Sequence, residues 1–371
     1  VRFVGGARPQ LRLASGDTSG ELKLWDLVLQ RPTASWPAST EGLVEIHEHG
    51  GGRELLTQAR DGRIKLWDME RLGSGAAPDE SLVRSIYTDA FHFARCAAAR
   101  RGTSRPRRPE PDNDDGPASS GLAALLAANP DDAAREDEEP NAVVGAEDAV
   151  DYLILAPSEP MESMTLWDTR CEAHVQRLGV GQKESEALGM CLSARLWLPS
   201  PQPTGPPPLA VIGYEGGDVI LWDLAMMRPR VHGRKNIFKS PVMGLDLSPD
   251  GRRLFAAAVE PKARVWRLGD DGRLAPRSPP LPVNCEASEY AKDGVGQLAL
   301  RPDGKLFATG GWDFRLRLFS AKPPNFAPLA VLRYHAASIN ALDFSPDSSL
   351  LAAGSKDLKI SMWSLYPPRE G

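Results

Sequence analysis

Hydrophobic residues alternate with polar ones in short segments along the chain, a period that predicts β-strands. Seven of these segments end in Trp or Phe, with apolar residues three and one positions before it. The pairs are Leu22 and Leu24, Ile64 and Leu66, Met164 and Leu166, Val219 and Leu221, Ala263 and Val265, Leu316 and Leu318, and Ile360 and Met362. Each pair lies on one face of a strand and the aromatic residue on the other. Because both faces are apolar, each strand is expected to be covered on both sides by neighbouring sheets.

The segment ends repeat a Trp-Asp dipeptide or a variant of it. They are Trp25-Asp26, Trp67-Asp68, Trp167-Asp168, Trp222-Asp223, Trp266-Arg267, Phe319-Ser320 and Trp363-Ser364. The spacings of 42 residues from 25 to 67 and 44 residues from 319 to 363 match the roughly 40 to 45 residues of one WD-repeat blade. Longer spacings indicate the same blade with insertions. The pattern therefore predicts an all-β fold, a single seven-bladed WD-repeat β-propeller over residues 1–371.

Two kinds of turn recur within the repeats. Gly20, Gly62 and Gly217 follow a residue that stands six positions before the Trp, which predicts a tight turn with positive φ between the last two strands of a repeat. Upstream, an apolar strand is followed by Ser-Pro-Asp, as at 248–250 and 345–347. Proline at the second turn position ends the strand.

The last repeat contains a set of polar residues that is typical of a WD repeat: His335, Ser355, Asp357 and Trp363. In such repeats these side chains form a buried hydrogen-bond relay that fixes the strand order of the blade. We expect them to be structural. A Ser/His/Asp catalytic triad is the alternative only if the repeat is disregarded.

The seventh blade is expected to lack its outer strand. The sequence starts at Val1 in an apparent strand without an initiator Met, which suggests a fragment, and after Trp363 come Tyr366 and two prolines. Proline is a poor residue for a central strand. We expect three strands in this blade and the weakest point of the ring at its seam.

Two stretches interrupt the repeats. Residues 96–150 are first basic and then strongly acidic, and they are poor in aromatic residues, so we expect a disordered insertion within blade three. Leu122, Leu125 and Leu126 could form one face of a short helix inside it, either transient or a docking motif. Residues 199–208 form a Pro-rich loop in blade four. Both stretches fall between the first two strands of a blade and are expected at the same rim.

Composition limits the other possibilities. The chain of 371 residues has a net charge of −5, which argues against nucleic-acid binding through phosphate neutralisation. Its four cysteines, Cys96, Cys171, Cys191 and Cys285, are scattered, which disfavours a zinc site and suggests reduced thiols. No apolar run approaches the roughly 18 residues of a membrane span. We expect no cofactor, no metal and no small-molecule substrate.

The C-terminal part carries a family resemblance. The stretches 310–319, 328–335 and 351–366, which include Gly310-Gly311-Trp312-Asp313 and Gly354-Ser355-Lys356-Asp357, resemble the fungal ASTRA-associated protein 1 family and its animal relative, the guanine nucleotide-binding protein beta-subunit-like protein. The resemblance implies a non-enzymatic nuclear subunit of the ASTRA assembly, associated with chromatin remodelling. It also implies a link to the co-chaperone machinery that matures phosphatidylinositol-3-kinase-related kinases.

Other functions were weighed against this one. No phosphate-binding loop or H-E-x-x-H motif indicates an enzyme, and His47 and His49 are expected to be solvated loop residues. A chromatin peptide reader would use Trp312, Phe314 and Tyr334 with Glu215 or Asp313 as the acid, although Trp312 and Tyr334 could instead pack between blades. A true G-protein β subunit would need an N-terminal helix to pair with a γ subunit.

The residues predicted to contact partner proteins lie near one rim in the last two blades. They combine amphipathic aromatic residues with cations, a mixture that is enriched in interface anchors. They are Trp312, Phe314, Arg315, Tyr334, Lys356 and Tyr366.

Overall fold

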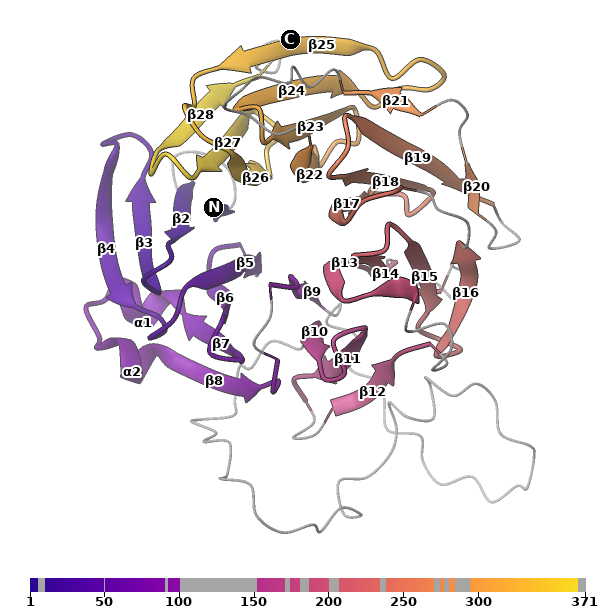
Figure 1. Cartoon of the computed structure of the whole chain (residues 1–371). Coiled ribbons are helices and arrows are strands. Elements are labelled where there is room, and N and C mark those ends of the chain that lie inside the picture. The colour runs from indigo at the N-terminus through magenta and orange to yellow at the C-terminus, as the bar shows by residue number, and fades with distance from the viewer. Residues whose placement is uncertain are drawn as a thin grey trace, which may run out of the picture.

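The structure is a computed structural model. It describes residues 1–5, 11–49, 51–90, 93–100, 152–170, 174–180, 187–199, 207–233, 238–269, 274–276, 280–283 and 294–365. Within these residues the chain forms seven antiparallel sheets arranged as a ring (Figure 1). The sequence-based prediction of a seven-bladed β-propeller is therefore confirmed.

Each sheet is one blade, and its strands follow one another in chain order. Blade one holds β1 (Arg2–Val4), β2 (Arg12–Gly16), β3 (Glu21–Asp26) and β4 (Arg31–Pro37). Blade two holds β5 (Leu43–His49), β6 (Glu54–Ala59), β7 (Arg63–Asp68) and β8 (Leu82–Tyr87). Blade three holds β9 (Ala97–Arg100), β10 (Tyr152–Ser158), β11 (Ser163–Asp168) and β12 (His174–Leu178). Blade four holds β13 (Cys191–Trp197), β14 (Leu209–Tyr214), β15 (Val219–Asp223) and β16 (Arg228–Gly233).

The remaining three blades differ in their outer strands. Blade five holds β17 (Val242–Leu247), β18 (Arg253–Ala258) and β19 (Lys262–Leu268), with β20 (Leu274–Pro276) and β21 (Leu281–Pro282) both paired to β19. Blade six holds β22 (Val295–Leu300), β23 (Leu306–Gly311), β24 (Arg315–Ser320) and β25 (Pro328–Arg333). Blade seven holds β26 (Ile339–Phe344), β27 (Leu350–Ser355) and β28 (Ile360–Ser364). The described part of blade seven thus has three strands, as the sequence predicts.

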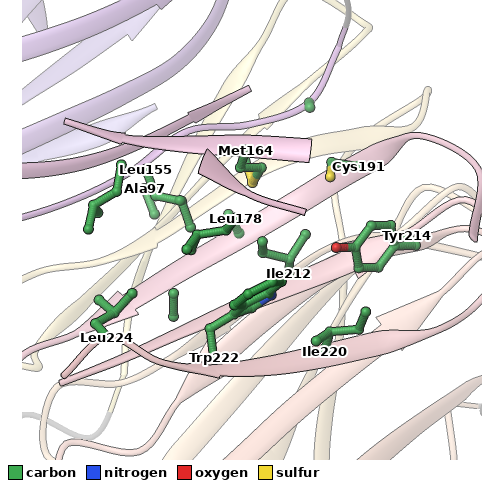
Figure 2. Close-up of a cluster of buried hydrophobic side chains, with 14 of the residues drawn as sticks. Ala97, Leu155, Met164, Leu178, Cys191, Ile212, Tyr214, Ile220, Trp222 and Leu224 are labelled. Carbon is green, nitrogen blue, oxygen red and sulfur yellow. The ribbon is translucent and has the colours of Figure 1, made fainter. Parts of the chain in front are cut away.

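The core is divided among the junctions between blades. The described residues form seven clusters of buried apolar side chains, and each cluster joins two adjacent blades. Figure 2 shows the cluster between blades three and four, in which Met164 and Leu178 face Ile212 and Trp222. The ring closes where Phe3 of blade one packs with Leu350 of blade seven. A single blade has nothing to cover its apolar faces, so its stability comes from its two neighbours.

Blade one shows why its third strand is apolar on both faces. Leu22 and Leu24 pack toward blade two, while Trp25 packs in the cluster shared with blade seven. The Asp that follows the Trp has a local role. Asp26 Oδ1 accepts hydrogen bonds of 2.8 Å from the N–H groups of Val28 and Leu29. A side-chain acceptor two residues before an N–H group stabilises the turn into the outer strand.

Blade two contains two short helices that the strand pattern does not predict, α1 (Met69–Gly73) and α2 (Pro78–Ser81). Asp68 is the N-cap of α1, because its Oδ1 accepts from Glu70 N at 2.8 Å and from Arg71 N at 3.1 Å. A carboxylate at this position satisfies N–H groups that the helix leaves unpaired. The Asp that forms a turn in blade one thus starts a helix in blade two.

The first insertion begins later than predicted. Ala97–Arg100 forms β9, which pairs with β10, and Cys96 is fully buried. Residues 96–100 therefore belong to the propeller, and the rest of the predicted insertion, from 101 on, lies outside the described residues. Both insertions connect the first and second strands of a blade, β9 to β10 and β13 to β14, as expected.

Candidate protein-interaction surface

Two rims follow from the strand order. Because neighbouring strands are antiparallel, the connections from first to second and from third to fourth strand emerge on one side of the ring, and the others emerge on the opposite side. We call the first side the insertion rim, since the end of β9 and the start of β10 lie there. The second is the relay rim, and in blades six and seven it carries the turns 311–315 and 355–359 and the connection 334–338.

The predicted contact residues that are described lie on the relay rim. Tyr334 is 57% exposed and its ring meets the His335 ring edge-on, with centroids 5.2 Å apart. Lys356 is exposed, and Phe314 and Arg315 are half-buried. Trp312 is also half-buried, and its indole lies so close to β22 that a Cβ atom at Gly296 would be 2.7 Å from its nitrogen. Tyr366 lies outside the described residues.

Two bulky residues on this rim have a backbone conformation that favours glycine. At the corresponding turn, Gly20, Gly62 and Gly217 have positive φ in blades one, two and four. Blades six and seven place Phe314 at φ 68° and Leu358 at φ 64° there. Such values are outliers for a bulky residue. Leu358 is also 96% exposed, so its side chain gains no burial in the isolated chain. Sequence analysis missed Leu358, although the absence of glycine after Asp357 marks it.

The polar relay of blade seven forms, with one change of residue. His335 Nδ1 is 3.1 Å from Asp357 Oδ2, and its Nε2 is 2.8 Å from the hydroxyl of Ser361. Trp363 Nε1 donates to the same hydroxyl at 3.0 Å. Ser361 therefore replaces the predicted Ser355, whose hydroxyl instead donates to the Ala337 carbonyl at 3.0 Å. The relay holds the connection from β25 against β28, so it positions Tyr334.

Register explains the change. In blades one and two the Trp donates to a hydroxyl on the second strand, Trp25 to Ser15 at 2.7 Å and Trp67 to Thr57 at 2.9 Å. The same place in blade seven is Ala353, and its cross-strand partner is Ser361. Side chains of paired residues stand on the same face, so Ser361 can supply the hydroxyl from the neighbouring strand.

Blade six holds its turn by an ion pair instead of a relay. Arg317 Nη1 is 3.0 Å from Asp313 Oδ1, and both side chains are almost fully buried. The second guanidinium nitrogen, Nη2, contacts Asp313 Oδ2 at 2.5 Å. Because Asp313 is buried and its charge is balanced by Arg317, it does not present a free carboxylate to a peptide.

A layer of charged residues, which sequence analysis missed, lines the inner edge of the ring. Arg2 Nη1 is 3.2 Å from Asp343 Oδ1, and Arg195 Nε is 3.4 Å from Asp246 Oδ1. The acids also bond to the next blade: Asp343 accepts from Phe3 N at 2.6 Å and Asp246 accepts from Leu300 N at 2.7 Å. These contacts join the inner strands of blades four and five, five and six, and seven and one, the pair that closes the ring.

His47 belongs to this inner layer, which corrects its predicted place in a solvated loop. It lies on β5, is 4% exposed, and its Nε2 is 3.1 Å from the Cys96 carbonyl. Burial, together with the charges of Arg2 and Arg195, lowers the pKa of His47 to about 3. The imidazole is therefore neutral at pH 7, and it donates to the carbonyl as a structural group.

Metal ligands, thiols and apolar helices are the remaining features to consider among the described residues. No group of three His, Cys, Asp or Glu side chains there is arranged to hold a metal ion. Cys96 and Cys191 are buried free thiols, and burial raises the pKa of both. In the described part, no helix is long and apolar enough to cross a bilayer.

Comparison with known proteins agrees with this architecture. The family "WD domain, G-beta repeat" matches residues 284–320 and 326–364, which together include the strands β22 to β28 of blades six and seven. The chain is a WD-repeat β-propeller. The β-propeller domain of Cps50 (Swd1) from Myceliophteria thermophila has a TM-score of 0.64 at 14% sequence identity, with 98% of this chain and 96% of that chain covered. This likeness concerns the fold alone.

Relatives in sequence cover most of the chain. ASTRA-associated protein 1 of Aspergillus niger is 27% identical over an alignment of 362 residues, gaps included, which covers 88% of this chain and 73% of that protein. ASTRA-associated protein 1 of Verticillium alfalfae is 26% identical over an alignment of 351 residues, which covers 90% of this chain and 72% of that protein. Guanine nucleotide-binding protein subunit beta-like protein 1 of Mus musculus is 26% identical over an alignment of 328 residues, which covers 88% of this chain and 79% of that protein. The predicted resemblance to the ASTRA-associated protein 1 family is thus confirmed over nearly the full length.

Proposed function

We propose that the protein is a non-catalytic scaffold that binds partner proteins through the relay rim of blades six and seven. The observation that carries the proposal is Leu358, with φ 64° and 96% exposure. A left-handed backbone costs a bulky residue about 1–2 kcal/mol, and no burial offsets this in the isolated chain. Full burial of a leucine side chain is worth about 1.5–3 kcal/mol, which is comparable to the strain, so a partner that covers Leu358 would offset it.

The proposed partners are subunits of the ASTRA assembly. The name ASTRA-associated protein 1, shared by relatives that match most of this chain, supports this choice. We extend the proposal to a role in chromatin remodelling and in the co-chaperone machinery that matures phosphatidylinositol-3-kinase-related kinases. The nucleus is the proposed site of action.

Affinity purification of the tagged chain from its native organism, followed by quantitative mass spectrometry, tests this proposal. Enrichment of ASTRA subunits and kinase-maturation subunits over an untagged control is the expected result. Their absence, with the chain itself recovered and folded, would contradict the proposed partners. A propeller of similar fold but unrelated sequence, carrying the same tag, is the control for non-specific capture.

A further inference from the structure

A groove on the outer side of the ring lies between blades five and six. Its volume is about 230 Å³, and its lining includes Arg315, Arg317, Val331 and Arg333 of blade six and Pro282 of blade five. The outer strand of blade five, which borders the groove through Pro282, is divided. β20 pairs with residues 266–268 of β19, and β21 pairs with residues 262–263. The outer edge of residues 264–265 therefore has no partner strand among the described residues, while their inner edge pairs with β18. Figure 1 shows β20 and β21 as separate short strands beside β19.

Three arginines share the face of blade six that borders this groove. Arg315 on β24 is directly opposite Arg333 on β25, and Arg317 is opposite Val331. Residues two apart on a strand, and residues paired across strands, stand on the same face. Like charges directly opposite each other destabilise a sheet, so this arrangement is unfavourable for the isolated fold.

The charges of the three arginines are compensated unequally. Arg317 forms the buried ion pair with Asp313. Neither Arg315 nor Arg333 has a carboxylate within 4 Å in the described part of the chain, and Arg333 is exposed. Val331, 50% exposed, stands beside them with Pro282 across the groove. The groove thus offers two uncompensated guanidinium groups next to an apolar floor.

We propose that this groove binds an extended acidic segment of a partner protein. Carboxylates of the segment would pair with Arg315 and Arg333, which are suited to bidentate hydrogen bonds, and an apolar side chain between them would cover Val331. A volume of about 230 Å³ is below the roughly 300–1,000 Å³ of sites for small molecules, and it suits one or two side chains. Arg315 begins β24 and Arg333 ends β25, so both arginines lie at the relay-rim ends of their strands.

This inference rests on the proposed scaffold function and names the chemistry of one partner segment. Its test is fluorescence anisotropy at low ionic strength with the full chain and a short fluorescein-labelled peptide in which Glu and Val alternate. The control peptide has Gln in place of each Glu. Arg315→Gln with Arg333→Gln is expected to weaken binding of the acidic peptide by at least about tenfold, because charge-assisted hydrogen bonds are lost. Arg12→Gln with Arg177→Gln removes the same charge from exposed sites on blades one and three, and it should change affinity by less than about twofold.

A second variant guards against misfolding as the cause. Val331→Asp places a carboxylate beside the arginines, so it should weaken peptide binding while it leaves the melting temperature unchanged or higher. Equal affinity of wild type and Arg315/Arg333 variant, or equal binding of the Gln peptide, would overturn the proposal. A gain in peptide affinity when Glu136, Asp137, Glu138 and Glu139 are neutralised in the full chain would assign the groove to this chain's own acidic segment, and would also overturn it. Partners that still co-purify with the Arg315/Arg333 variant would contradict the inference but leave the scaffold function intact.

Discussion

Thr57 and Thr309 occupy the same place in blades two and six but differ in their hydrogen bonding. Thr57 accepts from Trp67 Nε1 at 2.9 Å. In blade six the aromatic residue is Phe319, which stacks on Phe307 and has no N–H group. The hydroxyl of Thr309 is consequently buried without a hydrogen-bond partner in the described part of the chain.

Replacement of each threonine by valine should therefore have opposite effects. Thr309→Val removes an unsatisfied buried hydroxyl and keeps the β-branched shape, so we expect stabilisation by about 1 kcal/mol. Thr57→Val leaves the Trp67 N–H group unsatisfied, and we expect destabilisation by about 1–2 kcal/mol. Urea denaturation of both variants measures this. A change in stability of the same sign in both variants would show that the hydrogen bond from Trp67 does not determine the effect.

Asp357 is the second residue whose role can be measured. Burial alone would raise the pKa of Asp357, but hydrogen bonds from Ala336 N, the His335 ring and Lys359 N lower it below the usual value. A lowered pKa in the folded state stabilises the protein above the unfolded pKa of about 3.9, and this contribution is lost as the pH falls through the folded value.

Asp357→Asn should therefore destabilise the protein by about 2 kcal/mol at pH 7, and the difference should shrink as the pH falls below about 3.9 and toward the folded pKa. The reason is that a protonated Asp resembles Asn in charge and hydrogen bonding. Melting temperatures of both proteins from pH 7 to pH 3 give the comparison. An equal difference at all pH values would mean that the charge of Asp357 does not contribute.

At the scale of the strands, the sequence predicts the third strands well and some first strands poorly. The third strands carry their own pattern, Trp or Phe on one face and two apolar residues on the other. β9 reads Ala97-Ala98-Ala99-Arg100 and has no strand pattern. It is a strand because it pairs with β10 and because Gln58 of blade two accepts from Cys96 N at 2.7 Å. Contacts from other blades are not visible in a local window.

Backbone amides on the outer edge of β28 should exchange their hydrogens rapidly with solvent. Leu365 N donates to the Ser349 carbonyl, and amides alternate in direction along a strand, so the Met362 amide points away from β27. The equivalent amide in blade six is that of Leu318, which β25 covers. Hydrogen exchange resolved to single amides should show Met362 exchanging at least about a hundredfold faster than Leu318. Equal protection of the two amides would mean that another strand covers β28.

At the scale of the whole molecule, seven weak units are joined at seven apolar junctions, with charged residues binding the inner strands together. The seven blades follow from the repeat alone. The inner charged layer does not, because Arg2, Arg195, Asp246 and Asp343 are far apart in sequence and only the register of the inner strands brings them together. Residue type alone is enough to propose Tyr334 and Lys356 as contact residues. Leu358 is recognised from its backbone conformation in the structure.

A ring of this kind offers partners a broad surface built from the turns between its strands. In such a scaffold, the residues that stabilise the fold should differ from those that contact partners. The residues of the relay rim that bind partners should be dispensable for stability, and Leu358 should even oppose it. Backbone strain at an exposed residue lowers stability, and such strain is typical of functional sites.

Leu358→Gly tests this central claim most directly, with melting temperature and recovery of co-purified partners measured on the same protein. The account predicts a melting temperature that is unchanged or higher, because glycine relieves the positive φ, and partner recovery reduced by about fivefold or more, the loss of roughly 1 kcal/mol or more of contact. Met226→Gly, at a turn on the insertion rim where the side chain is 58% exposed, is the matched control and should leave recovery unchanged. Full partner recovery with Leu358→Gly, or a lower melting temperature, would contradict the account.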